Sequence, residues 1–213
     1  MSESNIIPLF PLGVVLFPEM PLPLHIFEER YKQMIRECLE QDRVFGVALS
    51  ENEQIQAVGC TARIVGVLKE YSDGRMDILT QGVERFAIDR VSEEKPYLQA
   101  HIQLLPGQGG TEAEVSEDLR GEAVGFLKKM IQTSGQDINL FEFEAMDSAQ
   151  ISFFIASYGL FTNPEKQELL EIDETEVRLK RELEMRPLVL RRLDFNARLT
   201  DASRNNGRLP KPK

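Results

Sequence analysis

The most distinctive segment of this 213-residue chain is Ile7–Tyr31, near its start, with the sequence IPLFPLGVVLFPEMPLPLHIFEERY. Proline has no backbone N–H to donate to a sheet, so it sits at strand ends and edges. Five prolines among Leu, Val, Ile and Phe therefore predict short strands and sharp turns that lead into a helix. That helix is predicted over Phe27–Gln41, where apolar residues recur at steps of three and four.

The residues that follow, up to Leu105, are typical of further short strands. Ser72-Asp73-Gly74 is a turn signal between two apolar runs and predicts a hairpin. Gln81-Gly82 is interpreted as the opening of the next strand. Short strands at even spacing favour a small barrel or a curled sheet. The hairpin is expected to join Ala62–Tyr71 to Arg75–Thr80. The other expected strand segments are Val44–Leu49, Val58–Leu68, Val83–Val91 and Tyr97–Leu105.

A boundary is predicted near Pro106, because Gly107–Gly110 has the composition of a flexible linker and the periodicity then becomes helical. Asn163-Pro164 is a strong helix start, since Asn caps well and Pro suits the first turn. We predict an α+β fold: a β-rich domain with one inserted helix (1–108), a helical bundle (109–202) and a basic disordered tail (203–213). The expected helices cover Glu112–Thr133, Ser148–Tyr158, a segment from Asn163, and one from about Glu174 that Pro187 ends or kinks before Leu188–Leu199.

The charge is unevenly distributed over the chain. The net charge is −10 and the pI about 4.9, which argues against a general nucleic-acid binder. Residues 174–213 hold 11 basic and 6 acidic side chains, a net of +5, which leaves −15 for the preceding residues. No apolar run reaches the roughly 18 residues of a membrane span, and the start lacks the basic region of a signal peptide, so a cytoplasmic protein is expected. Cys38 and Cys60 are expected to be buried, reduced thiols.

Tests for catalytic and metal-binding motifs are negative. No Gly-Lys pair exists for a P-loop, and no G-x-S-x-G elbow is present. His25 begins a pattern that resembles H-x-x-E-H, but Glu29 stands where the second His would be. We therefore expect no catalytic residue, no metal site and no cofactor. His25 is interpreted as a helix-start residue with a local hydrogen bond, and contact with a ligand is the alternative.

Several motifs together resemble the N-terminal, substrate-binding domain of the Lon protease family, in a stand-alone form. They are Pro8–Leu12, Val15–Pro18, Leu22–Leu24, Ile26–Glu28 with Arg30-Tyr31, Val58–Cys60, Asp73–Arg75, Leu79–Gly82 with Arg85-Phe86, Lys166–Glu171 and Arg178-Leu179. The resemblance implies a PUA-like pseudo-barrel followed by a helical bundle. In full-length Lon an ATPase module and a Ser–Lys peptidase follow this domain. Neither is expected here, so the protein is predicted not to be an enzyme.

The resemblance implies a module that binds unfolded or peptide segments of proteins and presents them to a separate ATP-dependent protease. The expected surface is the β face near Phe10, Phe17, His25 and Phe27 and a crevice against the helices, although the three Phe side chains also suit a core. The alternative is a PUA-like sensor of a small molecule or RNA, with the oligomeric state open. The substrate-binding candidates are Phe10, Phe17, His25, Phe27, Glu28, Arg30 and Tyr31; an RNA site would need Arg178, Lys180, Arg181, Arg191 and Arg192.

Overall fold

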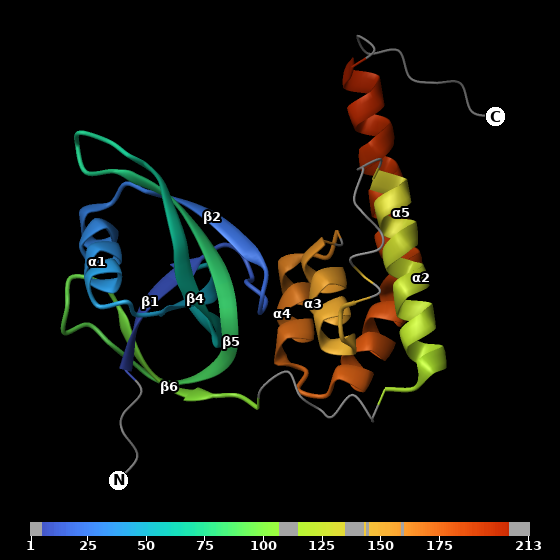
Figure 1. The fold of residues 1–213 in the computed structure, drawn as a ribbon, viewed down its shortest axis with the longest axis horizontal. Helices are drawn as coiled ribbons and strands as arrows, with labels where there is room; N and C mark the ends of the chain where they lie inside the picture. The colour runs from blue at the N-terminus through green and yellow to red at the C-terminus, as the bar shows by residue number, and fades with distance from the viewer. Residues whose placement is uncertain (1–5, 107–114, 135–142, 144, 159, 205–213) are drawn as a thin grey trace. The chain divides into compact units, whose positions relative to one another are not determined.

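The computed structural model describes residues 6–106, 115–134, 143, 145–158 and 160–204. Within these residues, six strands and five helices follow one another, so the α+β prediction is confirmed (Figure 1). The predicted linker 107–110, the first residues of the predicted helix 112–133 and most of the predicted tail 203–213 lie outside the described residues. The strands are β1 (Ile6–Leu12), β2 (Pro21–Ile26), β3 (Phe45–Glu51), β4 (Gln54–Glu70), β5 (Met76–Ser92) and β6 (Gln99–Leu104).

The helices agree with the predicted pattern, and of the two outcomes predicted at Pro187, an end or a kink, the end is wrong. The helix predicted from about Glu174 runs through this proline as one element, although Pro187 removes one backbone hydrogen bond. Burial of Met185, Val189 and Leu193 on both sides of the proline holds the helix together. The five helices are α1 (Glu29–Glu40), α2 (Glu117–Ser134), α3 (Ser148–Tyr158), α4 (Asn163–Glu171) and α5 (Thr175–Arg204).

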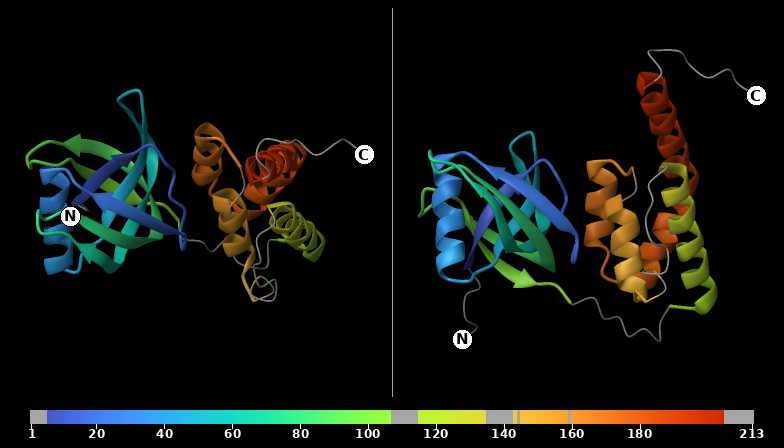
Figure 2. Two further views of the ribbon diagram at one scale, coloured as in Figure 1. Left: turned by 90° about the horizontal axis from the view of Figure 1, so that it is seen from above. Right: turned by 45° about the horizontal axis from the view of Figure 1, so that its top comes forward.

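The strands form one sheet in the order β2-β5-β4-β3-β1-β6, and β5 also pairs with β6. That extra pairing closes five of the strands into a barrel, which Figure 2 shows from two further sides. β1 is parallel to β3, with Leu9 opposite Gly46, and a parallel pair needs a long crossover. β2 and α1 supply this crossover, so the Pro-rich stretch carries the chain across the barrel.

The barrel encloses a core that the Pro-rich stretch helps to fill. The Phe10 and Tyr31 rings stack with centroids 4.0 Å apart and pack with Phe45 and the buried face of α1. A second cluster surrounds Phe86, which is fully buried between β3 and β4. A Cβ placed on Gly59 would lie 2.7 Å from the Phe86 ring, so this strand position accommodates only glycine.

The predicted strand break at Gln81-Gly82 is wrong, because β5 runs without interruption from Met76 to Ser92. Gly82 lies inside the strand, where its N–H donates to the Met20 carbonyl at 3.0 Å and its carbonyl accepts from the Glu19 N–H at 2.9 Å. The glycine is required by this close backbone approach and not by a turn. β4 likewise starts earlier than predicted, since Asn52 and Glu53 both adopt positive φ and make a two-residue hairpin loop.

The residues cluster into two compact units, and α4 belongs to the unit of the barrel. The first unit comprises 1–107 with 163–173, and the second comprises 108–162 with 174–213. In the second unit α2 and α5 pack side by side. The division at residue 108 that we derived from the sequence stays a prediction.

Arg85 of β5 binds the C-terminal end of α4 and so links this helix to the barrel. Its side chain is buried, and its guanidinium donates to the carbonyls of Leu170 at 2.9 Å and Ile172 at 3.1 Å. It also pairs with Asp173 at 2.9 Å. A cation that binds the last carbonyls of a helix satisfies groups that have no partner within the helix. Arg85 therefore acts as the C-terminal cap of a helix that is 85 residues away in the chain.

We expect Arg85→Met to lower the free energy of unfolding by about 2–4 kcal/mol, since hydrogen bonds to a charged group are lost and buried carbonyls are left without a donor. Amide hydrogen exchange should show α4 opening before the strands of the barrel. Arg63→Met is the matched control, because Arg63 is exposed and has no ion-pair partner in the described part of the chain. Unchanged exchange in α4 would contradict this role of Arg85.

Candidate functional site

The seven predicted binding residues separate into a buried group and a surface group. Phe10, Phe17 and Tyr31 lie in the core, with exposed fractions of 7%, 1% and 7%. Burial also raises the pKa of the Tyr31 hydroxyl. These three side chains shape the barrel and are left out of the candidate surface. The other four, His25, Phe27, Glu28 and Arg30, lie where β2 leads into α1.

Phe27 is the most exposed aromatic side chain among the described residues of the barrel unit, at 60%. Its ring stacks on that of His25 with centroids 6.0 Å apart, and the His25 ring meets the edge of Tyr71 at the same separation. His25, Phe27 and Tyr71 form what we call the aromatic surface. Pro21 and Pro23 are exposed at alternate positions before His25, so they extend the aromatic surface along β2.

His25 lies in β2 and not at a helix start, so that prediction is wrong. Its Nδ1 lies 2.5 Å from Asp77 Oδ1 on the neighbouring strand β5. The Tyr71 hydroxyl donates to the other oxygen of Asp77 at 2.8 Å. These two hydrogen bonds, that of His25 first, lower the pKa of Asp77. Asp77 thereby orients two of the three rings of the aromatic surface.

Cations surround Tyr71 on the same part of the molecule. Lys69 Nζ lies 4.4 Å from the centroid of the Tyr71 ring, and Arg75 Cζ lies 5.0 Å from it. Arg30 pairs with Glu28 at 2.8 Å, and its Cζ lies 4.6 Å from the centroid of the Tyr31 ring. The aromatic surface is therefore apolar at its centre and charged at its rim.

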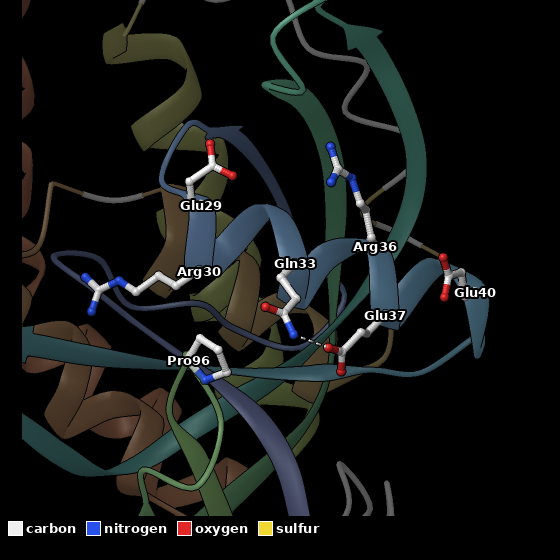
Figure 3. A pocket seen from close by; sticks show the side chains of 7 residues that line it. All are labelled: Glu29, Arg30, Gln33, Arg36, Glu37, Glu40 and Pro96. Carbon is white, nitrogen blue, oxygen red and sulfur yellow. Dashed lines mark hydrogen bonds between the residues drawn. The ribbon is translucent and has the colours of Figure 1, made fainter.

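A polar groove of about 620 Å³ follows the outer side of α1, and Figure 3 shows the side chains that line it. Glu37 lies in the groove and accepts hydrogen bonds from Lys95, Tyr97 and Gln33. These bonds, that of Lys95 first, lower the pKa of Glu37 to about 2. A groove of this polarity suits charged ligands better than apolar chains. Its lining residues are Glu29, Arg30, Gln33, Arg36, Glu37, Glu40 and Pro96.

We searched the described residues for a His side chain paired with a nucleophile and for a cluster of metal ligands. Neither His25 nor His101 hydrogen-bonds to a Ser, Thr or Cys side chain there; His101 meets Arg90 at 2.9 Å. No group of three or more His, Cys, Asp or Glu residues in these ranges is placed to hold a metal ion. Cys38 and Cys60 are buried and free, as predicted, and burial raises their pKa values to about 11 and about 12.

Four of the five basic residues that an RNA site would need have partners within the chain. Arg178 is buried, with an exposed fraction of 1%, and it donates to Ser152 Oγ at 2.8 Å. Lys180 pairs with Glu176, Arg181 with Glu184, and Arg192 donates to the Leu160 carbonyl. Arg191 is exposed and has no ion-pair partner in the described ranges. The contacts of the other four residues disfavour the nucleic-acid alternative, which stays a prediction. No described helix is long and apolar enough to cross a membrane.

Comparison with known proteins assigns the family. Residues 6–185 match the family model of the ATP-dependent protease La (LON) substrate-binding domain. The chain belongs to this family. The resemblance noted from the Pro-rich stretch is thereby confirmed over most of the sequence.

A curated relative of this Lon substrate-binding domain is a larger protein. The chain is 25% identical over 209 residues to Lon protease 2 of Syntrophobacter fumaroxidans, a match that covers 94% of this chain and 26% of that protein. It thus spans about a quarter of the length of this curated relative. Two solved structures share the fold: a Lon N-terminal domain protein from Xanthomonas campestris and the N-terminal domain of a Mycobacterium avium complex Lon protease. Their TM-scores are 0.71 and 0.70, at 23% and 17% identity; they cover 84% and 86% of this chain, and 98% of each of theirs is matched.

Sequence reasoning found His25 and Phe27 of the aromatic surface but missed Tyr71, and with it Asp77, which orients the His25 and Tyr71 rings. Tyr71 and Asp77 lie 46 and 52 residues after His25, and no local pattern links them to it. One usable signal was present: Pro21, Pro23 and His25 alternate along one face of a strand, and Phe27 continues the same alternation directly after it.

Proposed function

We propose that this Lon substrate-binding domain is a non-catalytic module that binds unfolded segments of proteins through the aromatic surface. The observation that carries the proposal is the exposure of Phe27, at 60%, beside two further rings held in place by Asp77. Large apolar side chains that stay in water at the centre of a polar rim are typical of binding surfaces for polypeptides. The family assignment supports the same class of ligand.

The finer proposal is an adaptor that presents bound segments to a separate ATP-dependent protease. It rests on the family assignment and on relatives that are Lon proteases, of which this chain matches about a quarter. Its test is degradation of a labelled unfolded protein by such a protease with ATP, with and without the chain. Acceleration that depends on Phe27 supports the adaptor, and an unchanged rate with intact binding contradicts it.

For the binding step we expect Phe27→Ser to weaken affinity for an unfolded protein by about tenfold or more, because burial of a Phe side chain contributes about 1.5–3 kcal/mol. Reduced, carboxymethylated α-lactalbumin with a fluorescent label is a suitable probe, and anisotropy titration is the measurement. The matched control is Phe195→Ser, since Phe195 of the helical unit is 61% exposed. Equal losses of affinity in both variants would contradict the assignment of binding to the aromatic surface.

A further inference from the structure

The hairpin of β4 and β5 continues beyond the part of the sheet that β3 covers. β3 pairs with β4 only as far as Ala62, opposite Phe45, whereas β4 goes on to Glu70 against β5. Residues 63–70 of β4 therefore form an open edge, which we call the β4 edge. Within the described ranges, the backbone of the β4 edge hydrogen-bonds only in the β4–β5 ladder. Unpaired backbone groups along a strand are a template for a further strand.

The hairpin of β4 and β5 is bordered by two edges, the β4 edge on one side and β2 on the other, and the two differ in chemistry. On the opposite side β2 pairs with β5, and it contains Pro21 and Pro23, which have no N–H to offer a further strand. The β4 edge contains no proline and has the sequence Arg-Ile-Val-Gly-Val-Leu-Lys-Glu. β-Branched residues of this kind favour strands. One edge is thus protected against strand addition, while the other has kept its full set of backbone donors and acceptors.

The side chains of the β4 edge are apolar and exposed. Val65, Val67 and Leu68 have exposed fractions of 50%, 44% and 64%. The register with β5 shifts between Ile64 and Gly66 and again between Val67 and Lys69, so Val65 and Leu68 are bulge residues. A β-bulge twists a strand edge and limits the length over which another strand can pair with it. A short single segment is consequently a better fit to the β4 edge than an extended sheet.

The charged residues at the two ends of the β4 edge favour extended segments with acidic ends. Arg63 and Lys69 flank the apolar part of the β4 edge, and both are exposed. Arg63 has no ion-pair partner in the described part of the chain. Lys69 lies over the Tyr71 ring and opposite Asp77 of β5, but no ion pair among the described residues fixes its ammonium group. A segment with an acidic residue at each end would pair with these cations, whereas a segment with basic ends would be repelled.

We propose that the β4 edge accepts one extended polypeptide segment as an added strand, with apolar residues at its centre and an acidic residue at each end. The proposal deepens the function proposed above and rests on it, since it names the conformation and charge of a bound segment. Backbone hydrogen bonds provide most of the affinity in this mode of recognition, and alternate side chains provide the selectivity. The aromatic surface would bind apolar parts of the same unfolded protein.

The test uses the full chain and the peptide Asp-Thr-Val-Thr-Val-Thr-Asp-amide, with an uncharged fluorophore in place of an N-terminal acetyl group. Two further versions carry N-methyl groups, one on the Val nitrogens and one on the Thr nitrogens. Only one set of N–H groups of an added strand faces the edge, so one version should lose binding by at least about tenfold and the other should bind much like the parent. Equal binding of both versions would overturn strand addition, because side-chain contacts alone would then explain the affinity.

Protein variants supply the second arm of the test. Leu68→Lys should weaken peptide binding about tenfold, and the pair Arg63→Glu with Lys69→Glu should reverse the preference towards a peptide with lysine ends. Labelled α-lactalbumin separates the two proposals. Phe27-dependent binding of α-lactalbumin without peptide binding overturns the β4 edge and leaves the proposed function standing, while failure of both probes overturns both. Self-association that Leu68→Lys abolishes, with no peptide binding, assigns the edge to a second copy and also overturns the proposal.

Discussion

Replacing Gly82 by alanine is expected to lower the free energy of unfolding by about 3 kcal/mol or more. A Cβ at this position would lie 2.1 Å from the Phe17 carbonyl oxygen and 2.9 Å from its carbon, distances that no rotamer change can relieve. The backbone of Gly82 also binds Met20 and Glu19, so moving the strand away breaks two hydrogen bonds. The measurement is urea unfolding followed by circular dichroism.

Gly66→Ala is the matched control for this substitution. Gly66 is also a strand glycine, of β4, and a Cβ there would have open space, with nothing within 4 Å. We expect this variant to unfold within about 0.5 kcal/mol of the parent protein. If the two alanine variants unfold at the same urea concentration, the close approach of Gly82 to Phe17 is not what requires glycine.

The second large effect is expected at Arg178, in the helical unit. Arg178 and Glu182 are both buried, and Ser152 links them: Arg178 Nε donates to Ser152 Oγ at 2.8 Å, and Ser152 Oγ donates to Glu182 Oε1 at 2.7 Å. At a pH above the folded pKa of Glu182, Arg178→Met leaves an ionised, buried carboxylate without its nearby cation and should cost about 3–5 kcal/mol. The double variant with Glu182→Gln should recover part of this loss, because no buried charge then remains. A double variant as unstable as the sum of the single variants would contradict the coupling.

Glu182 also makes the stability of the helical unit depend on pH. Burial raises the pKa of Glu182 well above its ordinary value, although Ser152 and Arg178 oppose the shift. A raised folded pKa gives a stabilising contribution that is complete below the unfolded pKa, about 4.3, and is lost as pH rises through the folded pKa. The Glu182→Gln variant should therefore gain stability relative to the parent as the pH is raised. A difference that stays constant with pH would show that the carboxyl group has the same pKa in the folded and unfolded states, and would contradict the raised pKa.

The elements that sequence reasoning found are those with strong local signals. The apolar run Ser148–Tyr158 is α3, and the Asn163-Pro164 start is the start of α4. The errors arose where a tertiary contact overrides the local pattern. Gly82 suggested a strand opening but serves a close approach to Phe17, and Pro187 lies within a helix that packing holds together.

The candidate site could be located only approximately from the sequence. Ile7–Tyr31 has Phe at 10, 17 and 27, and nothing local separates the two buried rings from the exposed one. Exposure depends on which side of the barrel wall each residue faces, and partners as distant as Asp77 and Tyr71 set that geometry. The β4 edge was hidden for a related reason. Its openness follows from where β3 stops and not from its own residues.

The docking of α4 on the barrel limits which fragments of the chain can be expressed as an intact barrel unit. Because residues 163–173 belong to the unit of the barrel, the chain passes between the two units three times, after residues 107, 162 and 173. A fragment that ends at residue 107 would lack the helix whose carbonyls bind Arg85, and would expose a buried guanidinium. The barrel is thus a discontinuous module. Grafting it into another protein requires a permuted or internally linked design in which α4 is rejoined to β6.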